Sequence, residues 1–315
     1  MNAPAPRGAA GPTVALVLGS GGARGLAHIG VIEVLRERGY RVVAIAGSSM
    51  GALVGGIHAA GRLDDYKAWA CALQKLDVLR LVDWTLSPSG FIRGERVIAA
   101  LRGLVGEAMI EDLPVAYTAV ATDIDLEREV WLSRGPLFDA IRASIAIPSL
   151  FTPVRRDGHT LVDGGLLNPL PVSAVLHAIT DLTIAVDVNA PDERLRRRAL
   201  EPAPPVAPAP AAAEPAPGDL RARMAQFIEG LFDRGAAQPE PVEPSWRDLL
   251  SRSLETMQGA ITRMKLATHT PEIVIRIPRN AAAFYEFYRA AEMIELGRAR
   301  ATRALDKFEA RLARG

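Results

Sequence analysis

Short runs of consecutive apolar residues alternate, over residues 13–190, with segments in which apolar residues recur every three or four positions. The short runs predict strands buried on both faces of a parallel sheet, and the longer period predicts amphipathic helices. The predicted strands are residues 14–18, 42–46, 115–121, 129–132, 160–162 and 182–188. The predicted helices are residues 26–38, 52–60, a segment beginning near 64, 95–104, 137–144 and 172–178. This alternation favours one three-layer α/β domain.

Residues 191–244 break this pattern. Within them, residues 201–217 contain seven prolines and seven alanines, a composition that cannot form the interior of a regular helix or sheet. We therefore expect a disordered or polyproline-like linker over residues 191–218. An apolar stripe at helical spacing follows and predicts a short amphipathic helix. The stripe consists of Leu220, Met224, Phe227, Ile228, Leu231 and Phe232.

The two ends of the chain complete the predicted organisation. Residues 1–12 carry no periodic pattern, and we expect a disordered tail there. Residues 245–315 are predicted to form a helix, a strand and a long terminal helix at 246–267, 272–277 and 281–312. One strand and two helices make a poor independent core. We therefore expect these elements to pack on the domain formed by residues 13–190.

Composition and charge narrow the class of protein. Hydrophobic residues at 49% and charged residues at 23% are ordinary for a globular protein, and a net charge of +1 gives no reason to expect nucleic acid. The single cysteine, Cys71, excludes an internal disulfide framework and suits a reducing compartment. We find neither a secretory signal nor an apolar stretch of about 20 residues that could span a bilayer. We expect a cytoplasmic protein, with peripheral contact at the inner face of the membrane left open.

The first candidate for chemistry is the stretch Gly47-Ser48-Ser49-Met50-Gly51, between a predicted strand and a predicted helix. Strand, Gly-x-Ser-x-Gly and helix form the arrangement of a nucleophile elbow, in which a sharp turn presents a serine hydroxyl to the substrate. The crowded backbone of such a turn admits only glycine on either side. The helix that follows directs its unpaired amides at the site, where they favour negative charge. This register makes Ser49 the candidate nucleophile.

The glycine-rich turn Gly19–Gly25, after the first strand, has three interpretations. A dinucleotide site would use its amides to bind a pyrophosphate, but it also needs an acidic residue at the end of the second strand, and this chain has none there. An oxyanion hole would use the same amides to stabilise the anion formed when a serine attacks an ester. A tight turn without a ligand is the third interpretation. The candidate elbow one strand away favours the oxyanion hole.

A serine nucleophile needs a base, and two candidates follow it in the chain. The order Ser49, Asp163, His177 is that of the α/β-hydrolase triad, but His177 falls within a predicted helix, where a histidine is more often a surface or core residue. The same holds for His28 and His58. Asp163 lies in a sharp Asp-Gly-Gly turn and could take the serine proton directly. An unshifted Asp with a pKa of about 3.9 is a weak base, and burial would raise its pKa.

These motifs together resemble those of the patatin-like phospholipases. The resemblance rests on Gly21-Gly22-Ala23-Arg24-Gly25, on the stretch 47–51 and on Asp163-Gly164-Gly165, in that order. The bacterial branch similar to neuropathy target esterase is indicated by three further stretches, at 27–31, 143–148 and 168–171. The resemblance covers residues 13–190, with weaker similarity over 245–310.

The resemblance implies an α/β/α sandwich around a mostly parallel sheet and a Ser-Asp dyad without a catalytic histidine. Ser49 matches the family's nucleophile and Asp163 its base. Gly21, Gly22 and Arg24 match the backbone donors of its oxyanion hole. The implied activity is hydrolysis of acyl esters of phospholipids or lysophospholipids through an acyl-enzyme, with no metal and no cofactor. The chain departs from the family pattern at Ser20, where the loop usually begins with glycine.

Three alternatives remain open at this stage. The Arg24 side chain could neutralise a lipid phosphate, or it could fix the loop by pairing with a carboxylate, which we favour. The cluster of Asp123, Asp125 and Glu127 resembles a metal site only loosely, and a solvated hairpin turn is the better interpretation. A protein that keeps the fold but only binds lipid or a regulator is a second functional class. The intact pair of Ser49 and Asp163 argues against that class.

Overall fold

The structure is a computed structural model that describes residues 11–81, 84–87, 90–148, 150–192 and 246–314. The apolar stripe, all but the first two residues of the predicted linker and all but the last two residues of the predicted tail lie outside the described residues. The chain divides into two compact units, residues 1–193 with 254–315 and residues 194–253. In the second unit the described residues form the first turns of helix α9 (Trp246–Thr268). Everything below concerns the first unit.

An eight-stranded mixed sheet forms the middle of the first unit. Its five parallel strands lie in the order β10 (Ile273–Pro278), β9 (Leu182–Ala190), β1 (Thr13–Leu18), β2 (Arg41–Ser48) and β5 (Ala116–Asp123). Antiparallel strands extend it beyond β5: β6 (Arg128–Leu132), β8 (His159–Asp163) and β7 (Val154–Arg156). The strand β10, which comes from the end of the chain, therefore completes the parallel part of the sheet.

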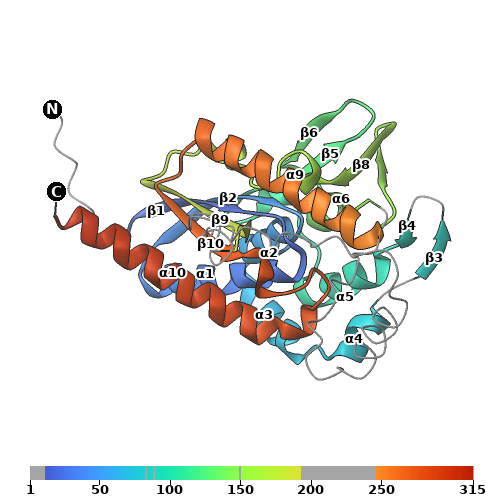
Figure 1. Cartoon of the computed structure of the whole chain (residues 1–315), viewed down its shortest axis with the longest axis horizontal. Helices are drawn as coiled ribbons and strands as arrows, with labels where there is room; N and C mark the ends of the chain where they lie inside the picture. The colour runs from blue at the N-terminus through green and yellow to red at the C-terminus, as the bar shows by residue number, and fades with distance from the viewer. Residues whose placement is uncertain (1–10, 82–83, 88–89, 149, 193–245, 315) are drawn as a thin grey trace, which may run out of the picture. The chain divides into compact units, whose positions relative to one another are not determined.

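Both faces of the sheet are buried. In β1, Val14, Leu16 and Leu18 belong to one hydrophobic cluster and Ala15 and Val17 to another, because successive side chains of a strand point to opposite faces. The first face is covered by α1 (Ala27–Glu37), α2 (Met50–Ala59) and α10 (Ala290–Leu312). The second is covered by the 3₁₀ turn η4 (Val172–Val175) and by the part of α9 that belongs to this unit, from Leu254 onward, which Figure 1 shows on the opposite side of the sheet from α10. The predicted three-layer α/β/α sandwich is confirmed.

Among the described residues, four further helices lie between α2 and β7 in the chain, and apolar side chains from three of them join the hydrophobic cluster of the first face. They are α3 (Leu63–Ala72), α4 (Lys75–Arg80), α5 (Glu95–Val105) and α6 (Leu137–Ser144), with a two-stranded hairpin of β3 (Trp84–Ser87) and β4 (Gly90–Ile92) between α4 and α5. The sequence predicted α3, α5 and α6 and missed α4, β7 and the hairpin. Among the described residues, no helix combines the length and the apolarity that crossing a bilayer requires.

Two predicted helices were wrong in their extent. The helix predicted at 172–178 is only the 3₁₀ turn η4, whose two buried valines, Val172 and Val175, are three residues apart and so suit the 3₁₀ period. The terminal helix begins at Ala290 rather than near residue 281. Before it, the carbonyls of Ala282 and Phe284 accept hydrogen bonds from the glycine-rich loop, which keeps this stretch out of a regular helix.

Candidate active site

The active-site candidates meet where β5 changes its neighbour. One edge of β5 pairs with β2 up to the pair Ser48–Val120, and from the next residue onward it pairs with β8, beginning at Asp163–Ala121. The other edge of β5 is taken by β6, which pairs with residues 119–123 and so overlaps the segments paired with β2 and with β8. The carboxyl ends of β2 and β8 therefore meet along a single edge, which brings Ser49 next to Asp163 although they are distant in the sequence.

Ser49 occupies a strained turn between β2 and α2. Its φ of 55° and ψ of −123° lie in a region that residues other than glycine rarely adopt, at a cost of about 1–3 kcal/mol. A Cβ atom at Gly47 would lie 2.4 Å from the carbonyl carbon of Gly51, and one at Gly51 would lie 2.0 Å from the carbonyl oxygen of Leu18. The two glycines of Gly-x-Ser-x-Gly are therefore required by close backbone approach.

Asp163 is buried, with 5% of its surface exposed. Its Oδ1 atom accepts a hydrogen bond of 2.7 Å from the amide of Gly165. Burial raises the pKa of the Asp163 carboxyl to about 6, against the opposing effect of hydrogen bonds from the Ser49 hydroxyl and the Gly165 amide. In the described part of the chain, no hydrogen bond of normal geometry joins Asp163 to the Ser49 hydroxyl, and Oδ2 has no partner. Catalytic hydrogen bonds commonly tighten only when substrate binds.

The glycine-rich loop after β1 lies beside Ser49. Gly22 lines the same cavity as Ser49, and its φ of 55° is one that glycine adopts without strain. Neighbouring amides are paired, since that of Ser20 donates to a carbonyl at 2.8 Å and that of Ala23 to another at 2.9 Å. No hydrogen bond involving the amides of Gly21 or Gly22 is found within the described ranges. These two donors remain able to bind a negatively charged oxygen.

The Arg24 side chain is fully engaged in holding this loop. It is buried, with 3% of its surface exposed, and its Nη1 donates to the carbonyl of Ala282 at 3.0 Å. Its Nη2 donates to Asn189 Oδ1 at 2.6 Å and forms an ion pair of 3.2 Å with Glu255 on α9. A further bond from Nε at 3.2 Å reaches the carbonyl of Val188 on β9. The guanidinium joins the loop to the sheet, to α9 and to the stretch before α10, and it is not directed at a ligand.

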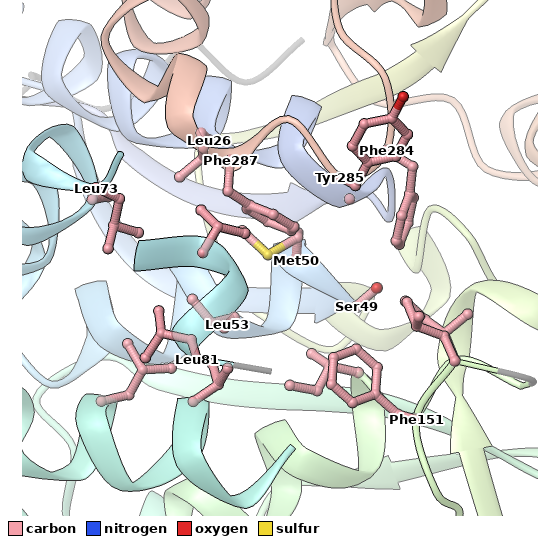
Figure 2. Close-up of a pocket in the computed structure, with 18 of the residues that line it drawn as sticks. Leu26, Ser49, Met50, Leu53, Leu73, Leu81, Phe151, Phe284, Tyr285 and Phe287 are labelled. Atoms are coloured by element: carbon pink, nitrogen blue, oxygen red, sulfur yellow. The ribbon is translucent and has the colours of Figure 1, made fainter. Parts of the chain in front are cut away.

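An apolar cavity of about 210 Å³ opens beside Ser49. Its walls come from α2, α3 and α5, from the loop after α6, and from the residues between β10 and α10. Figure 2 shows the Ser49 hydroxyl at one end and Leu73, the residue after α3, at the other. Phe284, Tyr285 and Phe287 lie over one side of it. Its lining, which lies entirely within the described residues, includes no charged side chain. Such a cavity suits a hydrocarbon chain.

Within the described ranges, no histidine hydrogen-bonds to Ser49 or Asp163. His177 is exposed and lies shortly before Asp181, whose amide bonds to Thr13 at the amino end of β1. The six residues of β1 span about 20 Å, so His177 lies toward the amino ends of the parallel strands, whereas Ser49 lies at their carboxyl ends. His28 is fully buried with its Nε2 atom 2.9 Å from the carbonyl oxygen of Gly19, and burial lowers its pKa to about 4. Burial also lowers the pKa of His58 to about 4.

The acidic cluster after β5 forms a turn. Asp123 Oδ1 accepts hydrogen bonds from the amides of Asp125 and Leu126 at 3.1 and 3.2 Å. Asp125 Oδ2 accepts one from the amide of Thr160 at 2.6 Å. Glu127 has a φ of 52°, which fits a tight hairpin turn. The carboxylates of Asp123 and Asp125 thus close the connection between β5, β6 and β8.

Two parts of the site were missed by the sequence reasoning. Ser144, at the end of α6, accepts a hydrogen bond of 3.0 Å from the Ser49 amide, and its own hydroxyl donates to the carbonyl of Val120 at 2.6 Å. A lone serine among buried apolar residues was the signal available for it. The aromatic residues Phe284, Tyr285 and Phe287 were assigned to the terminal helix. Their density just after a strand was the signal that could have marked a cavity wall.

Comparison with known proteins gives consistent matches. A family model described as patatin-like phospholipase matches residues 16–176. An uncharacterized NTE family protein of Mycobacterium tuberculosis is 41% identical over an alignment of 351 residues, which covers 96% of this chain and 94% of that protein. Two patatin-like phospholipase domain-containing proteins, from Caenorhabditis elegans and Mus musculus, are 34% and 33% identical over 190 residues. These alignments cover 58% of this chain and 14% of each of those proteins.

Proposed function

This chain belongs to the patatin-like phospholipase family of lipid hydrolases, and on that premise we propose that it is a serine acyl-ester hydrolase acting on phospholipids or lysophospholipids. The observation that carries the proposal is that Ser49, which meets Asp163 where β2 gives way to β8, lines one end of an apolar cavity. A buried carboxylate beside a strained serine has the components of a nucleophile and its base.

In the proposed reaction, the Ser49 oxygen attacks the ester carbonyl while its proton passes to Asp163. Collapse of the tetrahedral intermediate releases the alcohol, which takes that proton, and leaves the acyl group on Ser49. Asp163 then takes a proton from water, and the resulting hydroxide attacks the acyl-enzyme. The second collapse frees the fatty acid, and the proton held by Asp163 returns to Ser49. No histidine, metal or cofactor is invoked in these steps.

The raised pKa of Asp163 supports its role as a base. A carboxylate with a pKa of about 6 accepts a proton more readily than an exposed one, yet it is still ionised at neutral pH. The amino end of α2 directs its unpaired amides toward Ser49 and so favours the developing alkoxide. The amides of Gly21 and Gly22 are the proposed oxyanion donors, and each such donor is typically worth about 10²–10³ in rate.

The cavity supports an acyl chain as the part of the substrate that is bound most deeply. Apolar side chains exclude a charged head group from this space, because burial of an unpaired charge is costly. The head group would therefore remain outside the cavity, on the leaving-group side of Ser49. Contact with a lipid surface at the cavity mouth belongs to the same proposal.

The test is turnover of p-nitrophenyl acyl esters by the wild-type chain and three variants. Ser49→Ala and Asp163→Asn are expected to lose turnover to the level of the uncatalysed control. His177→Ala is expected to keep it, since His177 lies far from Ser49. Wild-type turnover by Ser49→Ala would overturn the assignment. Loss in His177→Ala with retention in Asp163→Asn would instead indicate a triad esterase.

A further inference from the structure

The carboxyl end of α6 contacts both members of the proposed dyad. The Ser144 hydroxyl oxygen accepts a hydrogen bond of 3.0 Å from the amide of Ser49. Two residues later, the carbonyl of Ala146 accepts a hydrogen bond of 2.9 Å from the amide of Asp163. A single short segment therefore holds the backbone of the nucleophile and the backbone of the base.

The strained turn leaves the Ser49 amide without a partner in the β2 ladder, and Ser144 accepts its hydrogen bond. With its φ of 55°, Ser49 has left the ladder of β2, and its buried amide requires another acceptor. The Ser144 hydroxyl supplies that acceptor and donates its own hydrogen to the Val120 carbonyl at 2.6 Å. Val120 is the residue of β5 opposite Ser48, immediately before β8 replaces β2 as the neighbour. Ser144 therefore satisfies two backbone groups at the junction.

The junction of β2, β5 and β8 leaves no room for a side chain at Gly164. A Cβ atom at Gly164, the residue after Asp163, would lie 2.0 Å from the Val120 carbonyl oxygen and 2.9 Å from Ser48 Oγ. Ser144 itself is fully buried, so solvent cannot replace its hydroxyl. A shift of the Val120 carbonyl or of the Ser49 amide would thus be transmitted directly to the turn that carries Asp163.

We propose that Ser144 is a positioning residue which, together with the Ala146 carbonyl, sets the separation between the Ser49 hydroxyl and the Asp163 carboxylate. This inference rests on the proposed serine-hydrolase function. Removal of the Ser144 hydroxyl takes away the acceptor of the Ser49 amide and a donor to the Val120 carbonyl. Ser49 then relaxes from its strained conformation and loses its alignment with the base. A misplacement of about 1 Å in a reacting group can cost about 10²-fold in rate.

The variants Ser144→Ala and Ser144→Cys test this. Ser144 does not line the cavity, so acyl binding is expected to persist. We expect Ser144→Ala to lower kcat, normalised to active sites titrated with a fluorophosphonate, by about 10- to 100-fold, while KM changes by less than about threefold. Ser144→Cys keeps the volume and a weak hydrogen-bonding group, and its kcat is expected to fall between the two. It also provides a folded test protein if the alanine variant does not fold.

The matched control is Thr122→Val. Thr122, on β5, also carries a fully buried hydroxyl, and its Oγ1 has no partner in the part of the chain that the structure describes. Its kcat and KM are expected to equal those of the wild-type chain. If the cysteine variant and any folded alanine variant retain kcat within twofold of wild type, or lose activity only through KM, the positioning role is refuted while the proposed function stands. If the wild-type chain neither labels nor turns over esters, both proposals fail.

Discussion

Replacement of Asp163 by asparagine is expected to abolish activity and, at the same time, to stabilise the folded chain at neutral pH. The buried carboxylate is harder to ionise in the folded chain than in the unfolded one, since burial raises its pKa from 3.8 to about 6. Asparagine has nearly the same shape and keeps an oxygen that can accept the hydrogen bond from Gly165. It cannot ionise, so it removes the free energy that the buried charge costs.

The sign and size follow from proton linkage. Between pH 3.8 and about 6 the folded state holds the Asp163 proton more tightly than the unfolded state, so the free energy of unfolding falls as pH rises through this window. A pKa difference of about two units corresponds to about 3 kcal/mol above pH 6. At pH 4.5 only about 1 kcal/mol has been lost. The stability advantage of Asp163→Asn should therefore grow by about 2 kcal/mol between pH 4.5 and pH 8.

Thermal unfolding of the two proteins at both pH values measures this. The difference in Tm, variant minus wild type, is expected to be larger at pH 8 than at pH 4.5 by on the order of 5 °C. Asp157→Asn is the control, because its carboxylate is 88% exposed and lies in a surface turn. Its Tm difference should be the same at both pH values. An advantage of Asp163→Asn that does not grow with pH would contradict the account of a destabilising buried charge.

Three further predictions concern the reaction, the turn and the cavity. The value of kcat/KM should rise with pH and level off above about pH 6, because Asp163 must be ionised to accept the Ser49 proton. Initial rates on p-nitrophenyl butyrate check this, and a rate independent of pH between 4.5 and 8 would count against it. Gly51→Ala should prevent folding or lower the free energy of unfolding by more than about 4 kcal/mol, since its Cβ would lie 2.0 Å from the Leu18 carbonyl oxygen. Gly103→Ala, in open space on α5, should instead raise the free energy of unfolding by about 0.5–1 kcal/mol. Denaturant melts compare the two variants. Leu73→Trp should shorten the cavity at the end far from Ser49 and lower kcat/KM for p-nitrophenyl decanoate by about tenfold or more relative to the butyrate ester; an unchanged ratio would show that the chain does not reach Leu73.

The fold could be predicted from the sequence because its central strands are buried on both faces and therefore appear as unbroken apolar runs. In β1 every residue from Val14 to Leu18 is buried, and such an unbroken apolar run is typical of a central parallel strand covered on both faces. The amphipathic pattern of α6 was equally clear, and its bounds were predicted correctly. Helix α4 and the β3–β4 hairpin were missed because they are short and carry no sustained period.

The site could be anticipated in its parts but not in its assembly. Gly-x-Ser-x-Gly and Asp-Gly-Gly are local patterns with local causes, which the close approaches at Gly47 and Gly51 make visible. What joins them is the exchange of β2 for β8 along β5, a long-range pairing that leaves no period in the sequence. The same is true of Ser144, whose two hydrogen bonds reach Ser49 and Val120 from a helix end.

Tertiary contacts also explain where local patterns misled. The aromatic stretch before α10 has helical spacing, but its backbone carbonyls bond to Ala23 and Arg24 of the glycine-rich loop instead. His177 follows Asp163 in the order of a triad, yet the chain has by then returned to the amino end of β1. Chain order alone could not distinguish the amino ends of the strands from their carboxyl ends.

The central claim is tested most directly by locating the covalent adduct of a fluorophosphonate probe. Tandem mass spectrometry of the labelled peptide can distinguish Ser49 from its neighbour Ser48, whose buried hydroxyl has no hydrogen-bond partner among the described residues. We predict a single adduct on Ser49, full labelling of Ser48→Ala and none of Ser49→Ala. An adduct on any other residue, or labelling that survives in Ser49→Ala, would contradict the assignment of Ser49 as the nucleophile.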